Sequence, residues 1–173
     1  MKEQIFKYRD QIHCVDIAIE EFTEKDAPEL EKVFKIVWSQ AYEYPKEWRK
    51  NRQPKKKEII KEMKSGYHFF GSRNEEEKIT GVYKLLVTDE GCFGEHQSIL
   101  PEYAGKKIAS AMYEQFIEYA KVQGCKKNYV NILEHHKACR WLVEKYGFCK
   151  VGDPFEQAEG MKVQKYERWC DEP

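Results

Sequence analysis

The sequence predicts a single α/β (α+β) domain, in which short strands alternate with amphipathic helices. Its 173 residues are the length of one ordinary domain. Apolar residues recur every three or four positions in two long stretches, 30–41 and 108–119, as on one face of a helix. Short runs rich in β-branched and aromatic residues, such as 79–88, stand between polar turns and are typical of strands.

The composition narrows the class of protein. Apolar residues make up 41% of the chain, enough for a sizeable core, and 30 basic residues balance 30 acidic ones. This balance gives no overall attraction to nucleic acid or to an anionic membrane, and no run is long enough to span a bilayer. The six cysteines form no C-x-x-C pair and no metal-ligand spacing, so we expect free thiols in a cytoplasmic protein without a metal.

The first third of the chain contains one strand and one well-defined helix. Residues 1–12 are a candidate N-terminal arm, and 14–22 alternate as a strand does. Asp26 and Glu29 have the spacing of a capping box, with Pro28 in the first helical turn. A helix is then predicted up to Ala41.

Residues 42–66 are aromatic and basic. Between Pro45 and Lys64 nine lysines and arginines stand against three glutamates, a net charge of +6. We expect a helix that begins near Pro54 and buries Ile59 and its neighbours. The plainest interpretation of this segment is a solvated face of helix and loop.

The remaining elements follow in order. Strands are predicted at 67–73, 79–88, 92–100, 127–134, 148–151 and 161–170, with helices at about 107–123 and 137–146. Asp153 and Pro154 predict a loop between the last two strands.

The unit at 92–124 is the most informative. An extended run ends before Pro101, and a short turn leads directly into the long helix. The free N–H groups of a first helical turn favour an anion, most often phosphate. An ordinary β–α crossover with nothing bound explains the same pattern.

Two motifs resemble the GNAT superfamily of acyl-CoA-dependent N-acetyltransferases. PEYAGKKIASAM at 101–112 is similar to its P-x-Y-[RQ]-G-x-G-x-[GA] loop, and VNILEHHKACRWLVEKYGF at 130–148 to its later N-x-x-A-x-x-L-Y-x-K-x-G-F helix. The resemblance implies a central mixed, mostly antiparallel sheet of six or seven strands. It also implies helices on both faces of the sheet, and two parallel strands that splay apart at the CoA site.

The chain departs from these motifs at four positions. Ala104 replaces the loop Arg or Gln, Lys107 the middle Gly, His136 the helix Asn, and Val143 the Tyr of the general acid. If the glycine position requires a positive φ, the Cβ of Lys107 costs about 1 kcal/mol.

The resemblance implies acetyl-CoA as co-substrate, with its pyrophosphate on the backbone of the loop and the thioester carbonyl near a strand N–H. The residues it assigns to this binding are Ile99, Tyr103, Ala104, Gly105, Lys106, Lys107, Ile108, Ala109 and His136. It also places the aromatic and basic segment beside the acceptor. A sharper interpretation of that segment is therefore a lid, with Trp38, Tyr42 and Trp48, together with Tyr44, as substrate-binding residues.

Attack by an amine requires its neutral form. An amine with a pKa of about 10.4 is neutral in only about one molecule in 10³ at pH 7, so a general base is expected. Glu95 is the first candidate, with His96 and Glu134 as alternatives. Strand alternation predicts that Glu95 and His96 lie on opposite faces, with Glu95 on the face of Ile99.

Two functions follow. One is an N-acetyltransferase that passes an acetyl group from acetyl-CoA to a primary amine, on a small molecule or a peptide, by direct attack in a ternary complex. The other, suggested by Ala104, Lys107 and Val143, is a catalytically weak acyl-CoA-binding or scaffold protein. A partner-binding module built on 45–64 is a weaker alternative, and a homodimer through the last strands is a further hypothesis.

Overall fold

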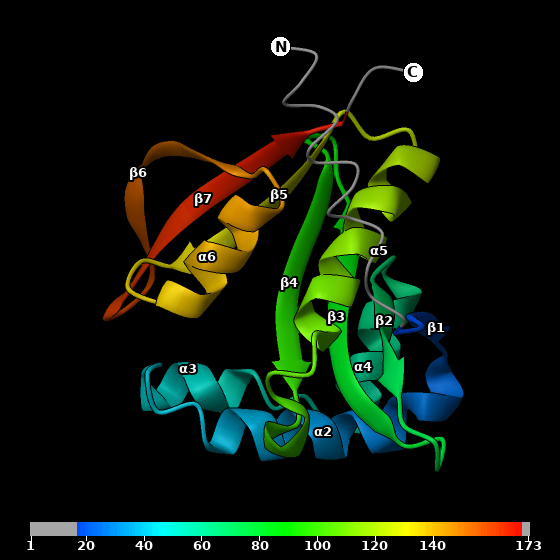
Figure 1. Ribbon diagram of the computed structural model, residues 1–173. Coiled ribbons are helices and arrows are strands. Elements are labelled where there is room, and N and C mark those ends of the chain that lie inside the picture. The colour runs from blue at the N-terminus through cyan, green and yellow to red at the C-terminus, as the bar shows by residue number, and fades with distance from the viewer. Residues whose placement is uncertain (1–16, 171–173) are drawn as a thin grey trace.

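A seven-stranded sheet forms the centre of the molecule, of which the computed structural model describes residues 17–170 (Figure 1). Its strands are β1 (Glu20–Phe22), β2 (His68–Arg73), β3 (Ile79–Val87), β4 (Cys92–Ile99), β5 (Lys127–Leu133), β6 (Cys149–Ala158) and β7 (Met161–Trp169). Their order in the sheet is β1-β2-β3-β4-β5-β7-β6, and every neighbouring pair is antiparallel except β4 and β5. The predicted mixed, mostly antiparallel sheet is confirmed.

Helices cover both faces of this sheet. They are α2 (Ala27–Ser39), α3 (Lys46–Asn51), α4 (Lys56–Lys64), α5 (Ile108–Val122) and α6 (Lys137–Lys145), with single 3-10 turns η1 (Glu24–Asp26) and η2 (Pro101–Tyr103). Because side chains of a strand alternate, Val82 of β3 packs into the core with α2 and α4. Its neighbour Tyr83 packs into the opposite core, with α5 and α6.

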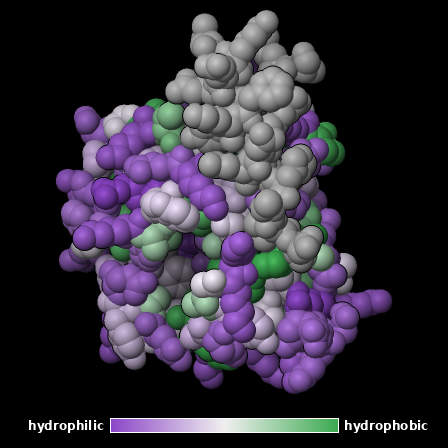
Figure 2. Space-filling model, viewed as in Figure 1, coloured by the Kyte–Doolittle hydropathy of each residue, from purple (hydrophilic) through white to green (hydrophobic). Residues whose placement is uncertain are grey.

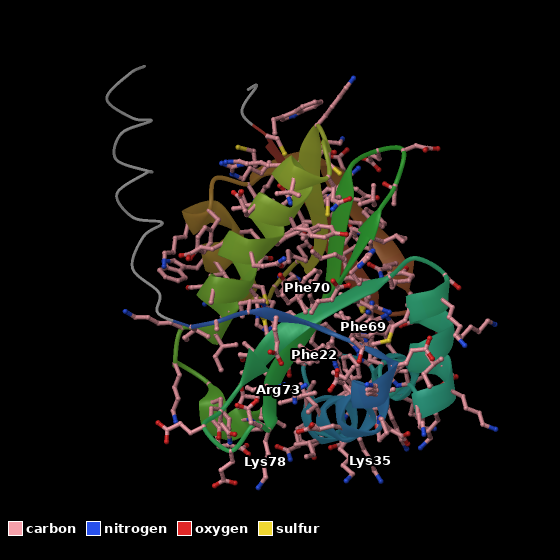
Figure 3. All side chains as sticks on the ribbon, turned by 90° about the vertical axis from the view of Figure 1, so that its right-hand side faces the viewer. Phe22, Lys35, Phe69, Phe70, Arg73 and Lys78 are labelled. Carbon is pink, nitrogen blue, oxygen red and sulfur yellow. The ribbon has the colours of Figure 1, made fainter. Side chains whose placement is uncertain are left out.

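The start of α2 corrects the predicted capping box. Asp26 accepts a hydrogen bond from the Thr23 N–H at 2.8 Å and lies 2.7 Å from Arg73 Nη2, and no side chain caps α2 itself. Glu29 accepts from the Ile79 N–H at 2.8 Å. Figure 3 shows Arg73 beside Phe22 at this edge of the sheet. Both carboxylates therefore join α2 to the sheet instead of capping the helix.

Three other boundaries differ from the predictions. The first strand is only Glu20–Phe22; residues 14–16 and the predicted arm at 1–12 lie outside the described part of the chain. A short helix, α3, lies within the predicted loop. The strand β6 continues through Asp153 and Pro154. It tolerates proline because it is an edge strand, and a register shift between Val151 and Phe155 absorbs the irregularity.

The parallel strands β4 and β5 touch over a very short length. Only Cys92 with Asn128, and Phe93 with Tyr129, are in register. Below these pairs the two strands diverge (Figure 1), which matches the expected splaying. The outer surface in the same view is mostly hydrophilic (Figure 2), and no helix between residues 17 and 170 combines the length and apolarity needed to cross a bilayer.

Candidate functional site

A bulge in β4 shapes the site. Between the paired residues Glu95 and Ser98 the register with β3 shifts, so that two residues of β4 lie opposite Tyr83 alone. His96 sits in this bulge with a φ of +61°. The bulge turns Glu95 and His96 toward the same side of the sheet, since Glu95 contacts the Arg52 side chain and His96 the Arg52 carbonyl.

This arrangement corrects the predicted strand geometry. Glu95 and His96 were expected on opposite faces, with Glu95 on the face of Ile99. Instead Ile99 packs with the core that contains α5, while His96 stacks on Phe34 of α2 at 4.3 Å between ring centroids. The alternation rule fails because the bulge inserts one extra residue into the strand.

A cavity of about 120 Å³ lies at the gap between β4 and β5. Strand β4 contributes Glu95 and His96, and β5 contributes Asn131. Its aromatic wall is Trp38, Tyr44 and Trp48. The Trp48 ring stacks on Tyr44 at 4.9 Å and packs edge-on against Trp38 at 5.4 Å. The cavity thus combines rigid aromatic surface with a few polar groups, as small-molecule sites do.

Glu95 is held by two cations at the edge of this cavity. Its Oε2 lies 3.2 Å from Arg52 Nη1, and its Oε1 lies 3.6 Å from Lys84 Nζ. Lys84 is further paired with Glu62 of α4 at 2.8 Å. The Arg52 guanidinium also lies over the Trp48 ring, 4.2 Å from its centroid. Helices α3 and α4 are therefore tied to the strand that carries the candidate base.

His96 is a neutral imidazole with a defined tautomer. Its Nε2 lies 2.9 Å from the Arg52 carbonyl oxygen, which can only accept, so Nε2 carries the hydrogen. The pKa of His96 is lowered well below its ordinary value by burial first, and then by the charges of Arg52 and Lys84. Its Nδ1 is buried without a hydrogen-bond partner.

The loop before α5 has the geometry of an anion site. Gly105 has a φ of +75°, and the N-cap Lys107 adopts a left-handed conformation with a φ of +64°. The N–H groups of Ile108 and the next two residues have no carbonyl partner within the helix, and no side chain caps them. The positive φ at Lys107 confirms that this position has the backbone conformation that glycine adopts most easily.

Comparisons with known proteins agree with this geometry. The sequence profile described as the Acetyltransferase (GNAT) family matches residues 30–148. The chain belongs to the GNAT family. No curated protein sequence matches it.

Three solved structures illustrate the shared fold. The PaiA N-acetyltransferase of Thermoplasma acidophilum, solved in complex with coenzyme A, is 18% identical and has a TM-score of 0.72, over 90% of this chain and 99% of that one. YncA of Salmonella typhimurium, solved with acetyl-CoA, is 14% identical with a TM-score of 0.73, over 91% of this chain and 95% of that one. A spermidine N-acetyltransferase SpeG chimera from Vibrio cholerae and hSSAT is 14% identical with a TM-score of 0.70, over 89% of this chain and 95% of that one.

The residues of this GNAT chain fit coenzyme A. The parted strands β4 and β5 leave a gap that Met112 and Tyr113 of α5 also line, and the N–H groups in the first turn of the same helix lack helical partners. Of the loop residues expected to bind the cofactor, Tyr103 is fixed by a hydrogen bond of 2.9 Å from Asn74 Nδ2 to its hydroxyl.

The expected acceptor residues of the GNAT site divide into two groups. Trp38 and Trp48 line the cavity, and Trp38 Nε1 is fixed by a 2.8 Å hydrogen bond to Ser98 Oγ. Tyr42 is 76% exposed and lies outside the cavity, with Arg49 over its ring. Tyr44 takes the place in the aromatic wall that the sequence suggested for Tyr42.

Two predicted residues lie in a separate surface pocket. Glu134 and His136 line a depression of about 580 Å³ around the start of α6, and neither lines the cavity at Glu95. His136 is the N-cap of α6: its Nδ1 accepts from the Cys139 N–H at 3.2 Å. Its Nε2 lies 3.6 Å from Glu43. Val143, in place of the family tyrosine, is fully buried.

Sequence reasoning missed two residues of the cavity, Arg52 and Asn131. Arg52 is one of nine basic residues in its segment, and nothing in the pattern distinguishes it. Asn131 did carry a signal, because it is a polar residue within the short apolar run Val130 to Leu133. A polar side chain in such a strand is a candidate for a site.

Proposed function

We propose that this protein is an N-acetyltransferase that moves an acetyl group from acetyl-CoA to a primary amine by direct attack in a ternary complex. The observation that carries the proposal is the cavity at the β4–β5 gap, where the Glu95 carboxylate faces an aromatic wall. Acetyl-CoA supplies an activated thioester at this gap.

Glu95 is the proposed general base. Its carboxylate lines the cavity with its side chain 18% exposed, so a bound amine can reach it. An ionised carboxylate has about four lone-pair sites, so contacts with Arg52 and Lys84 leave capacity for a substrate N–H. His96 is the weaker candidate because its unprotonated Nδ1 is buried without contact to solvent.

Trp38, Tyr44 and Trp48 would enclose the carbon skeleton of the acceptor and exclude water. Burial raises the pKa of both Tyr44 and Tyr113, so these cavity-lining phenols stay protonated at neutral pH. Their hydroxyls offer hydrogen-bond donors that Val143 lacks, while the raised pKa makes them weaker acids than a free tyrosine. Backbone N–H groups at the start of α5, with Lys106 and Lys107 beside them, would hold the pyrophosphate.

Steady-state thiol release from acetyl-CoA with a panel of amines tests this function. Glu95→Gln should lower kcat by about 10²- to 10³-fold, the usual contribution of a general base, while binding of CoA measured by calorimetry is retained. Glu134→Gln, a carboxylate outside the cavity, is the matched control and should change kcat by less than about threefold. Equal losses in both variants would contradict the role of Glu95.

The second candidate is a GNAT-fold acyl-CoA-binding protein with little catalysis. The complete burial of Val143 at the family's acid position favours it. Tight binding of CoA without turnover of any amine in the panel would establish this alternative in place of the transferase.

A further inference from the structure

The pairing of β4 and β5 places Glu95 and Asn131 on the two sides of one opening. The last residues in register are Phe93 and Tyr129, whose rings stack at 5.0 Å between centroids. Glu95 and Asn131 each lie two residues further along their own strand. Side chains two apart in a strand share a face, and both residues line the same cavity.

Asn131 carries an unmet requirement for a hydrogen-bond donor. Its Oδ1 is buried and has no partner among the described residues. A buried carbonyl without a donor costs free energy, which a ligand N–H at this place would recover. Glu95, on the other side of the opening, likewise presents acceptor atoms only.

Two acceptors facing one opening match the hydrogens of a primary amine. A neutral primary amine has two N–H groups and one lone pair. If one N–H points to Asn131 Oδ1 and the other to Glu95, the lone pair is left to point into the gap between the strands. A secondary amine has one N–H and can satisfy only one of the two residues.

We propose that Asn131 is a specificity-determining residue that binds the acceptor nitrogen and selects primary over secondary amines. This inference rests on the proposed transferase function. In the reaction the lone pair of the nitrogen forms the new N–C bond, the C–S bonding pair leaves on sulfur as the CoA thiolate, and Glu95 takes the proton that the nitrogen loses. The hydrogen that remains on the product amide still faces Asn131 Oδ1.

The test compares matched acceptors in wild type and Asn131→Ala. The probes are benzylamine and 2-phenylethylamine, each beside its N-methyl derivative, with kcat/KM measured by thiol release from acetyl-CoA. Wild type should prefer the primary amine by at least about tenfold. In Asn131→Ala, kcat/KM for the primary amine should fall about 10- to 100-fold while that for the N-methyl amine falls less than about threefold.

Two further measurements separate specificity from structure. Asn51→Ala, at an exposed asparagine outside the cavity, should leave the ratio unchanged. The Kd of CoA from calorimetry should stay within about threefold in Asn131→Ala. If that variant does not fold, Asn131→Leu, which has nearly the same volume and no acceptor, repeats the comparison.

Three outcomes would overturn the assignment of Asn131 to the acceptor nitrogen. An unchanged primary-to-secondary ratio in Asn131→Ala overturns this inference and leaves the transferase function intact. A weakened CoA Kd with an unchanged ratio also overturns it, because the Asn131 carbonyl would then serve the cofactor. Absence of turnover by wild type on every amine overturns the transferase function and this inference together.

Discussion

Arg52 Nη1 lies 3.2 Å from Glu95 Oε2, and this contact joins the C-cap of α3 to the bulge of β4. The same residue accepts a hydrogen bond from His96 through its carbonyl and covers the ring of Trp48 with its guanidinium. Arg52 thereby fixes the aromatic wall of the cavity relative to the candidate base.

Replacing Arg52 by methionine should lower the free energy of unfolding by about 1–3 kcal/mol. The Arg52 and Glu95 side chains are only 15% and 18% exposed, so the loss should exceed that of a surface ion pair. Lys50→Met removes the exposed pair with Glu47 on the same helix and should cost less than about 0.5 kcal/mol. Urea denaturation measures both, and equal losses would contradict a structural role for the Arg52 contact.

Lys107→Gly should stabilise the protein by up to about 1 kcal/mol. Lys107 has a φ of +64°, where an L-residue with a Cβ is strained and glycine is not. The same change at Lys106, whose φ is not positive, should destabilise by about 0.5–1 kcal/mol through the entropy of the unfolded chain. A loss of stability in Lys107→Gly, seen as a lower midpoint in urea, would show that the strain is absent.

Stability should decrease in mild acid because of His96. Its pKa is lowered in the folded protein, so below about pH 6.5 the unfolded chain binds a proton there that the folded protein does not. The free energy of unfolding should therefore fall as the pH drops from about 6.5 to 5, by at most about 1.4 kcal/mol per pH unit from this group. Urea titrations over this pH range measure the free energy of unfolding of wild type and of His96→Phe. If His96 is not responsible, the difference between the two free energies does not change with pH.

Arg73→Met should be among the most destabilising changes outside the core, at about 2–4 kcal/mol. Arg73 pairs with Glu20, lies 2.7 Å from Asp26 and 3.5 Å from Glu29, and covers the ring of Phe22. Removal leaves three carboxylates without their shared cation. Lys78→Met, at the exposed pair with Glu76, is the control and should leave the midpoint of thermal unfolding unchanged.

Helices, strands and turns that depend on local sequence patterns could be predicted from the sequence. The helix α5, the strand β3 and the turn at Gly105 follow from periodicity and turn residues, and the structure has them within a few positions. The side-chain partners were not predictable in this way. Asp26 and Glu29 have capping-box spacing, yet both serve Arg73 and Ile79, which are distant in the sequence.

In the candidate site, too, the sequence predicted which residues are involved better than where their side chains lie. Glu95 was identified from its position before the loop, and the cavity does include it. The predicted sheet face of Glu95 was wrong, because one inserted residue at His96 reverses the alternation of side chains along β4. No residue type in the sequence marks such a bulge. Glu134 and His136 were assigned from their places near a strand end and in a motif, and the structure puts both in a different pocket.

Only two residue pairs hold β4 to β5, so the seven strands form two ladders that meet at a short seam. A movement that widens or narrows the opening can bend the backbone at this seam while the hydrogen bonds inside each ladder stay intact. The core that α5 and α6 share with both ladders then limits how far the two halves can part. Amide hydrogen exchange should be faster for the N–H groups of β4 and β5 that face the gap beyond Phe93 and Tyr129 than for those that face β3 and β7.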